Sequence, residues 1–241
     1  MKIDILSLFP EMFNGFLETS IIKRAIDKSV CQIDVHNFRT FSKNKHQKVD
    51  DYPYGGGEGM VLTCQPILDC LKSITCDDSF IILMSPQGIS FNQSIAVDFA
   101  QKKHIIIICG HYEGFDERIR DYVDLEVSIG DYVLTGGELG SMVVSDAIIR
   151  LLDGAIKADS HQNDSFSCGL LEHPQYTRPF VYDGNSVPEV LISGHHENIR
   201  KWRKYESLRK TYLKRPDLLE NYELNREELQ FLNEIKEKYW F

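Results

Sequence analysis

The sequence predicts an α/β domain with a mostly parallel sheet and helices on both faces, followed by a small helical domain. Two compact apolar runs, at residues 80–84 and 104–109, are typical of strands that are buried on both faces of a parallel sheet. Helical patterns alternate with strand patterns up to about residue 155, which favours βαβ crossover connections. Near the end of the chain, Leu229, Leu232 and Ile235 follow helical spacing.

The expected elements alternate through the first two thirds of the chain. The predicted strands are β-rich, with alternating or continuous apolar residues, at 2–8, 32–36, 80–84, 104–109 and 124–128. The predicted helices show apolar periodicity at 10–28, 66–72, 92–102, 116–122 and 138–152. Pro10 suits the first turn of the first helix, because an N–H there has no helical partner. Residues 37–59 are polar, glycine-rich and irregular.

A polar stretch without periodicity divides the chain. Residues 157–168 have this character and predict a mobile linker. We therefore expect an α/β domain at 1–156, the linker at 157–168 and a helical domain at 169–241. In the last domain, Asn225 and Glu228 are spaced as a helix capping pair.

Composition excludes several classes of protein. The 241 residues are 42% apolar and 26% charged, as in an ordinary globular protein. No run approaches the ~20 apolar residues of a membrane span, and the first residues predict a strand rather than an export signal, which favours the cytoplasm. None of the six cysteines forms a Cys-x-x-Cys pair, so we expect reduced, mostly buried thiols and no metal site.

The negative charge of the chain is unevenly distributed. The net charge is −9, yet residues 195–215 contain eight Lys or Arg residues opposed by Glu197 and Glu206. Such a segment indicates either a solvated helix face or a local contact with the phosphates of a nucleic acid.

Three glycine-bearing turns follow three predicted strands. They are Ser85-Pro86-Gln87-Gly88, the segment from Gly110 to Gly114, and the segment from Ile129 to Gly137. Parallel sheets bind ligands at the carboxyl ends of their strands, where glycine permits close approach of the backbone. The turns therefore predict either one small-ligand site or three ordinary tight turns.

The glycine-rich segment at 55–59 does not match the common nucleotide-binding motifs. It lacks the Gly-Lys-Ser/Thr ending of a phosphate-binding loop. No Gly-x-Gly-x-x-Gly opens a helix after a strand either. The residues alone thus indicate a small ligand that is not an ordinary polyphosphate.

Several segments together resemble one family. Residues 54–60 (Tyr-Gly-Gly-Gly-Glu-Gly-Met) resemble the glycine-rich signature of bacterial tRNA (guanine-N1)-methyltransferases. The resemblance runs from about residue 2 to about residue 230, and its further motifs lie at 85–88, 109–114, 128–134, 164–166, 169–172, 176–179, 202–203 and 215–219. It implies the SPOUT fold with a deep trefoil knot, a homodimer with each active site between two subunits, and methylation of N1 of the guanine immediately 3′ of the anticodon.

The resemblance also implies site residues. The family's catalytic acid matches Asp164 and its catalytic arginine matches Arg150. The positions that match its S-adenosylmethionine site are Ser85, Pro86, Gln87, Gly110, Tyr112, Glu113, Gly114, Ile129, Gly130, Asp131, Tyr132, Val133, Leu134, Gly136 and Gly137. Magnesium is implied as well, without a residue set that can be carried over. His111 and Gly140 depart from the residues that many members have there.

The implied roles make chemical sense. N1 of guanine carries a proton that a carboxylate at Asp164 can accept, and a guanidinium at Arg150 can stabilise the charge that develops on O6. Glu113 has two open roles, offsetting the sulfonium charge of the donor or helping to hold magnesium. Taken alone, Asp164 is equally a solvated linker residue, and Arg150 a cation that complements a helix dipole.

Three rival functions share some of these features. A methyltransferase acting on another RNA position would have the same fold and donor site. A non-enzymatic RNA-binding module would account for the basic segment alone. A nucleotide hydrolase or kinase rests only on residues 55–59, and the missing Gly-Lys-Ser/Thr makes it the weakest alternative.

Overall fold

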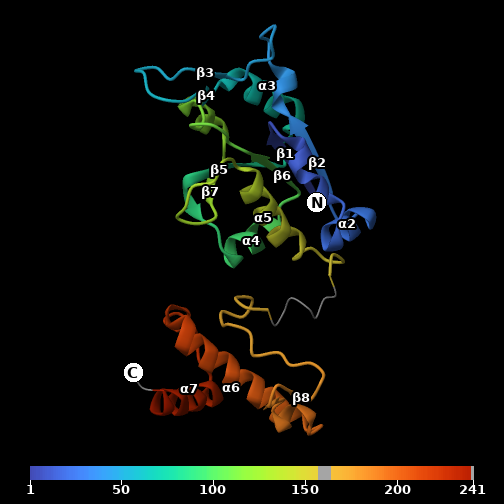
Figure 1. Cartoon of the computed structure of the whole chain (residues 1–241), viewed down its shortest axis with the longest axis vertical. Coiled ribbons are helices and arrows are strands. Elements are labelled where there is room, and N and C mark those ends of the chain that lie inside the picture. Colours follow the sequence, from blue (N-terminus) through green and yellow to red (C-terminus); the bar gives the residue numbers. More distant parts are fainter. Residues whose placement is uncertain (157–163, 240–241) are drawn as a thin grey trace. The chain divides into compact units, whose positions relative to one another are not determined.

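The first part of the chain is built on a five-stranded sheet. The structure is a computed structural model that describes residues 1–156 and 164–239. The chain divides into two compact units, Met1–Ala158 and Asp159–Phe241. Neighbouring strands of the sheet are all parallel (Figure 1). Their order is β2 (Gln32–Asn37), β1 (Lys2–Ser7), β6 (His104–Ile108), β5 (Ser79–Ser90) and β7 (Leu125–Ser128). The predicted parallel α/β fold is confirmed.

Helices cover both faces of this sheet, because successive side chains of a strand point to opposite faces. Ile105 and Ile107 enter one hydrophobic core, and Ile106 and Ile108 enter another. The helices in the first core are α2 (Ser20–Asp27), α4 (Gln93–Ala100) and α5 (Glu138–Ile149). The helices in the second core are α3 (Cys64–Ile74) and the 3₁₀ helices Phe38–Phe41 and Glu117–Tyr122. The central strands therefore lack a polar face, as their continuous apolar runs predicted.

The continuous helix predicted at 10–28 is wrong. The segment contains a 3₁₀ helix (Pro10–Phe13), α1 (Asn14–Leu17) and then α2. Thr19 between them has an extended backbone, and Ser20 has a positive φ of 54°. The Thr19 hydroxyl also donates a hydrogen bond to the Gly15 carbonyl at 2.6 Å. Local side-chain bonds of this kind compete with the helical ladder, which is why the periodic pattern does not form one helix.

The first predicted turn lies inside a strand. β5 continues through residues 85–88 to Ser90, and its register with β7 shifts between Met84 and Ile89. Such an irregularity bends a strand and changes the direction of its side chains. Residues 85–87 therefore form a bulge at the sheet edge rather than a loop after a strand.

A short antiparallel pair closes the glycine-rich loop. β3 (Asp50–Asp51) pairs with β4 (Val61–Leu62), with Asp50 opposite Leu62. Leu62 is fully buried in the second core. The pair therefore holds both ends of the loop at residues 52–60 against the sheet domain.

The second unit is a small helical core. α6 (His196–Lys214) and α7 (Arg226–Lys238) pack through Leu208 and Ile235. Asn225 and Glu228 form the predicted capping box, each side chain bonding the other's backbone N–H. The predicted apolar stripe is wrong at Leu229, which is 49% exposed because it faces away from α6.

The prediction that residues 169–241 are helical throughout is wrong for the first part. Residues 169–195 contain an antiparallel pair, β8 (Val181–Tyr182) and β9 (Asn185–Ser186), and a 3₁₀ helix at Glu189–Ile192. A further 3₁₀ helix, Pro216–Leu219, follows α6. Pro174, Pro179 and Pro188 interrupt helix formation here, because proline lacks the N–H and restricts the residue before it.

Two other expectations are settled only in part. The mobility predicted for 157–168 falls mainly on 157–163, which lie outside the described residues. Residues 164–168 form turns, with the Phe166 N–H donating to the Leu170 carbonyl at 2.8 Å. Cys31, Cys70 and Cys109 are buried, but Cys76 and Cys168 are exposed and Cys64 is half-buried, so the expectation of mostly buried thiols is wrong. Among the described residues no helix is long and apolar enough to cross a membrane.

Candidate active site

A cavity of about 480 Å³ lies at the carboxyl ends of β6 and β7, beside the bulge in β5. All three predicted glycine-bearing segments contribute to its wall. Its volume lies within the range of about 300–1,000 Å³ that small-molecule sites usually have. The convergence follows from the parallel sheet, since carboxyl ends of adjacent parallel strands share one edge.

Almost every residue predicted to hold a methyl donor lines this cavity. The lining residues from that prediction are Ser85, Pro86, Gln87, Gly110, Tyr112, Glu113, Gly114, Ile129, Gly130, Tyr132, Val133, Leu134, Gly136 and Gly137. Asp131 belongs to the same segment but is not part of the lining. Its exposed side chain extends into solvent instead.

The second and third turns are joined by their backbones. The Gly137 N–H donates a hydrogen bond to the Gly110 carbonyl at 2.9 Å. A Cβ atom at Gly137 would lie 2.8 Å from the Cα atom of Cys109, closer than real side chains come. The absence of a side chain at Gly137 therefore lets the chain that enters α5 cross directly over the end of β6.

The glycine-rich loop at 52–60 supports the second turn. The Glu113 N–H donates to the Met60 carbonyl at 3.0 Å, and the Leu62 N–H donates to the Gly114 carbonyl at 2.9 Å. A Cβ atom at Gly59 would fall 2.4 Å from the Glu113 side chain. The loop thus acts as a backbone support for the cavity wall.

Two polar groups are buried near the cavity, one on α5 behind its lining and one in its wall. Glu138, at the start of α5, is 2% exposed and accepts a hydrogen bond from the Ser7 hydroxyl at 2.7 Å. The His111 ring lies between Phe9 and Tyr112, with ring centroids 4.8 and 4.9 Å away. Its buried Nδ1 has no hydrogen-bond partner among the described residues. A buried polar atom of this kind at a cavity wall suits a ligand or water that supplies the missing bond.

Arg120 contacts the first glycine-bearing segment of the cavity lining. Arg120 forms ion pairs with Glu117 at 2.9 Å and with Glu126, and donates to the Gln87 side chain at 3.3 Å. The hydrogen bond with Glu126, together with these neighbours, raises the pKa of Arg120 above its ordinary value. Arg120 therefore fixes Gln87 at the edge of the cavity.

The sequence did not assign several of these lining residues. They are Met84, His111, Phe115, Glu117, Arg120, Val127, Ser128, Thr135 and Gly140. Most of them lie directly beside the predicted turns in the sequence, so they could have been predicted as neighbours of those turns. To predict that Arg120 lines the cavity, one would have to know that the 3₁₀ helix Glu117–Tyr122 folds back toward β5.

The two predicted catalytic residues belong to different units. Arg150 caps the carboxyl end of α5 and is exposed, with its N–H bonded to the Asp146 carbonyl at 3.1 Å. Asp164 is half-buried in the second unit, where its carbonyl accepts from the Ser167 N–H at 3.2 Å. No group of three His, Cys, Asp or Glu residues within 1–156 and 164–239 is arranged to hold a metal ion.

Most of the predicted basic segment is already neutralised within the second unit. Arg200 pairs with Glu197 and Glu227 at 2.8 and 2.7 Å, and Lys204 pairs with Glu228 at 2.9 Å. Lys201 lies 3.9 Å from both Glu197 and Glu227, and the remaining pairs are Arg209 with Glu206 and Arg215 with Asp217. Because α7 supplies acids that the sequence count did not include, the segment is less positive than predicted.

Two basic residues of the segment are the most available to a nucleic acid, since Lys210 forms no ion pair among the described residues but donates to the Glu172 carbonyl at 3.1 Å. In the part of the chain that the structure describes, Arg203 and Lys214 form no ion pair. Trp202, next to Arg203, contacts the rings of His173 and Tyr176 at 6.3 and 6.2 Å. A free guanidinium beside an aromatic cluster is suited to phosphate and base contacts.

Comparison with known proteins identifies the family of this chain. The family model described as tRNA (Guanine-1)-methyltransferase TrmD matches residues 1–221. A tRNA (guanine-N(1)-)-methyltransferase of Bacillus licheniformis is 54% identical over 99% of this chain and its own full length. Proteins of the same name from Streptococcus uberis and Dictyoglomus turgidum are 57% and 52% identical, each over 99% of this chain and over 100% and 98% of their own lengths. The chain therefore belongs to the tRNA (guanine-1)-methyltransferase family.

Proposed function

We propose that this tRNA (guanine-N1)-methyltransferase takes its methyl group from S-adenosylmethionine and modifies the guanine immediately 3′ of the anticodon. The cavity at the carboxyl ends of β6 and β7, beside the bulge in β5, is the observation that carries the donor assignment. Its walls combine backbone groups of Gly110 and Gly130 with the apolar side chains of Met84 and Ile129. Such a lining suits a nucleoside with a charged sulfur, and the unpartnered His111 Nδ1 offers one polar anchor.

Asp164 is the proposed base and Arg150 the proposed stabiliser. In this scheme the Asp164 carboxylate accepts the N1 proton of guanine, while the N1 electron pair forms the bond to the methyl carbon and the sulfur keeps the electrons of the broken bond. The Arg150 guanidinium offsets the negative charge that develops on O6. Positioning of the two substrates contributes the rest of the rate acceleration, and no covalent enzyme intermediate is needed.

A homodimer is part of the proposal. Leu139 and Val143 on α5 are 50% and 48% exposed, and Val133 beside the cavity is 85% exposed. Exposed apolar side chains on one helix face are typical of protein interfaces. A second copy of the chain that packs on α5 would place each active site between two subunits. Two units on separate copies would then complete one active site.

Glu113 and magnesium belong to the same proposal. The Glu113 carboxylate is exposed and borders the cavity, where it offsets the sulfonium charge or holds magnesium together with substrate oxygens. The trefoil knot is also proposed, and the crossing of Gly137 over Gly110 supports it. We assign donor binding to 1–156, tRNA binding to 169–241, and a cytoplasmic location, where tRNA is found.

The decisive test is methyl transfer from labelled S-adenosylmethionine to a tRNA transcript with guanine 3′ of the anticodon, with magnesium present. We expect transfer by wild type, and near-complete loss with Asp164→Ala or with a transcript in which that guanine is replaced. Asp183→Ala, an exposed aspartate in the same unit, is the matched control. Transfer that survives replacement of the guanine would indicate another RNA position. RNA binding without donor binding would indicate a binding module.

A further inference from the structure

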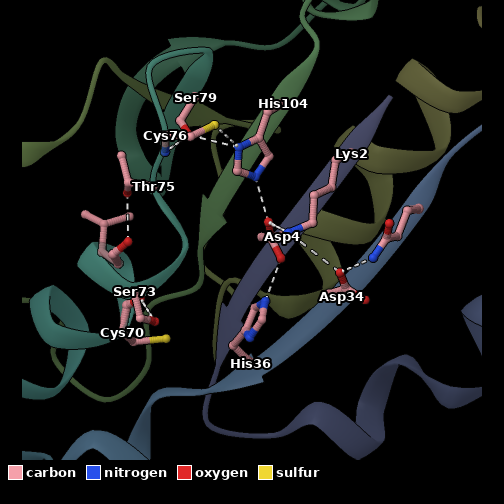
Figure 2. Close-up of polar contacts among 12 residues, drawn as sticks. Lys2, Asp4, Asp34, His36, Cys70, Ser73, Thr75, Cys76, Ser79 and His104 are labelled. Atoms are coloured by element: carbon pink, nitrogen blue, oxygen red, sulfur yellow. Dashed lines mark hydrogen bonds and ion pairs between the residues drawn. The ribbon is translucent and has the colours of Figure 1, made fainter.

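A compact cluster of polar side chains lies at the amino-terminal ends of the strands, opposite the cavity. Its members are Cys76 from the connection between α3 and β5, Ser79 at the start of β5, His104 at the start of β6, and Asp4 on β1. Figure 2 shows the His104 ring between Asp4 on one side and Cys76 with Ser79 on the other. The proposed methyl transfer uses none of these residues.

The cluster has the connectivity of a nucleophile, a base and an orienting acid. Cys76 Sγ lies 3.5 Å from His104 Nδ1, and His104 Nε2 lies 2.6 Å from the Asp4 carboxylate. The Ser79 hydroxyl lies 2.8 Å from the same Nδ1 and 3.4 Å from the sulfur. Because a carboxylate only accepts hydrogen bonds, it holds the His104 proton on Nε2 and leaves Nδ1 able to take a proton from the thiol.

Asp4, the acid of this cluster, is held in its charged form. Asp4 is fully buried, and its carboxylate contacts Lys2 Nζ at 2.8 Å and His36 Nε2 at 2.6 Å in addition to His104. Burial opposes ionisation, but the hydrogen bonds from Lys2, His36 and His104 keep the pKa of Asp4 below its ordinary value. An ionised Asp4 stabilises the positive charge that His104 gains when it accepts a proton.

The sulfur at the other end is accessible. Cys76 is exposed, whereas Cys31, Cys70 and Cys109 are buried and burial raises their pKa values. Hydrogen bonds from Ser79 and then from His104 lower the pKa of the Cys76 thiol. Cys76 thus combines accessibility with stabilisation of the thiolate, the two properties that make a thiol reactive.

We propose that Cys76 is a modification site, a thiol activated by His104 and Asp4 that forms a mixed disulfide with an oxidised low-molecular-weight thiol. The thiol proton passes to His104 Nδ1, and the thiolate attacks one sulfur of the small disulfide. A bond forms between Cys76 Sγ and that sulfur, and the disulfide bond of the reagent breaks. The leaving thiolate takes the proton back from His104. Cys76 is oxidised and one half of the reagent is reduced, so the electrons balance.

Other charges near the sulfur must enter any interpretation of its pH dependence. Lys103 pairs with Asp78 at 3.1 Å beside the cluster. The charged or titratable groups that surround Cys76 and His104 on the packed elements are Asp77, Asp78, Lys103, Lys2, Asp4, Asp34 and His36. Among these groups, Asp4 contacts the His104 ring directly. Substitution of His104 removes the contact between its ring and the sulfur but leaves the other charged groups in place.

The test uses glutathione disulfide on the reduced full-length protein and follows each cysteine by peptide mass mapping. For each unit by which a thiol pKa falls, the thiolate fraction rises about tenfold while nucleophilicity falls about threefold, a net gain of about threefold. We therefore expect Cys76 to react faster than the exposed Cys168 at about pH 6.5, by about threefold for each unit by which the hydrogen bonds from Ser79 and His104 lower its pKa. The ratio should fall at about pH 9, where ordinary thiols also ionise. Dithiothreitol should reverse the modification.

Substitutions test whether the cluster causes the faster reaction of Cys76. His104→Gln should abolish the advantage of Cys76 over Cys168, while His46→Gln, at an exposed histidine, should preserve it. Equal rates of Cys76 and Cys168 at about pH 6.5, or a ratio that does not change with pH, would overturn the proposal. So would a folded His104→Gln protein that retains the advantage. If that variant does not fold, Ser79→Ala and the wild-type pH profile decide the question.

Discussion

The Gly137 N–H donates to the Gly110 carbonyl at 2.9 Å, which ties the chain that enters α5 to the end of β6. The two residues lie on the second and third turns of the cavity wall. Their contact leaves no space for a side chain at Gly137, since a Cβ atom there would lie 2.9 Å from the Gly110 nitrogen. The shape of the cavity therefore depends on a single backbone crossing.

Gly137→Ala should damage both stability and donor binding. The new methyl group meets backbone atoms of Cys109 and Gly110, which cannot rotate away, so we expect a loss of about 1–3 kcal/mol in the free energy of unfolding. We also expect affinity for S-adenosylmethionine to fall by about tenfold or more, which is about 1.4 kcal/mol. Denaturant titration and calorimetry measure the two effects.

Gly15→Ala is the matched control for this substitution. Gly15 lies in α1, and a Cβ atom there has nothing within 4 Å. We expect unchanged donor binding and equal or slightly greater stability, because alanine favours helix. Equal behaviour of the two variants would contradict the assigned role of the Gly137–Gly110 crossing.

Arg203 and Lys214 should contribute to tRNA binding more than Arg200. Arg200 is held by Glu197 and Glu227, so its charge is largely offset, whereas Arg203 and Lys214 form no ion pair among the described residues. We expect Arg203→Ala and Lys214→Ala each to weaken binding and to reduce the slope of log affinity against log salt by about 1. Arg200→Ala is the control, and filter binding at several salt concentrations would show a smaller slope change for it. A larger effect at Arg200 would contradict the assignment.

The sequence predicted the sheet better than it predicted the side-chain clusters. Continuous isoleucines at 105–108 indicate a strand buried on both faces, and parallel strands place their following turns on one edge, so the cavity could be located in advance. The extension of β5 through 85–88 could not, because it depends on the Glu126 backbone lying 2.4 Å from where a Gly88 Cβ atom would be. No local pattern contains that contact.

The sequence also did not predict ion pairs and hydrogen bonds between side chains that are distant along the chain. The basic segment appeared more positive than it is because Glu227 and Glu228 are distant in sequence and reach it only when α7 packs on α6. Cys76 and Asp4 are separated from His104 by 28 and 100 residues. Neither spacing belongs to a motif, so only the fold brings the three side chains together.

Asp4 should make the stability of the protein sensitive to acid. Its folded-state pKa is lower than its unfolded value, so its contribution to stability is complete above the unfolded value and is lost as pH falls through the folded value. Asp4→Asn leaves Lys2, His36 and His104 without their charged partner and should cost about 3 kcal/mol or more at neutral pH. The loss should shrink in acid, where wild type is protonated as well.

Urea titrations at about pH 7 and at progressively lower pH test this expectation. Asp27→Asn is the control, since the Lys23–Asp27 pair is exposed and such pairs contribute about 1 kcal/mol or less. An Asp4→Asn protein with the same acid dependence as wild type would show that Asp4 is not the group responsible.

The exposed face of α5 should hold two copies of the chain together. Leu139→Lys and Val143→Lys place charges where the proposed interface excludes water, and burying an unpaired charge costs several kcal/mol. We expect sedimentation equilibrium to show a dimer for wild type and a monomer for the double variant. The monomer should lose methyl transfer while its donor cavity stays folded, because the cavity walls come from one copy and Asp164 in the proposed active site comes from the other. Leu229→Lys is matched in exposure, at 49% against 50% for Leu139, but lies on α7. This control should remain dimeric and active, whereas loss of the dimer in both proteins would move the interface away from α5.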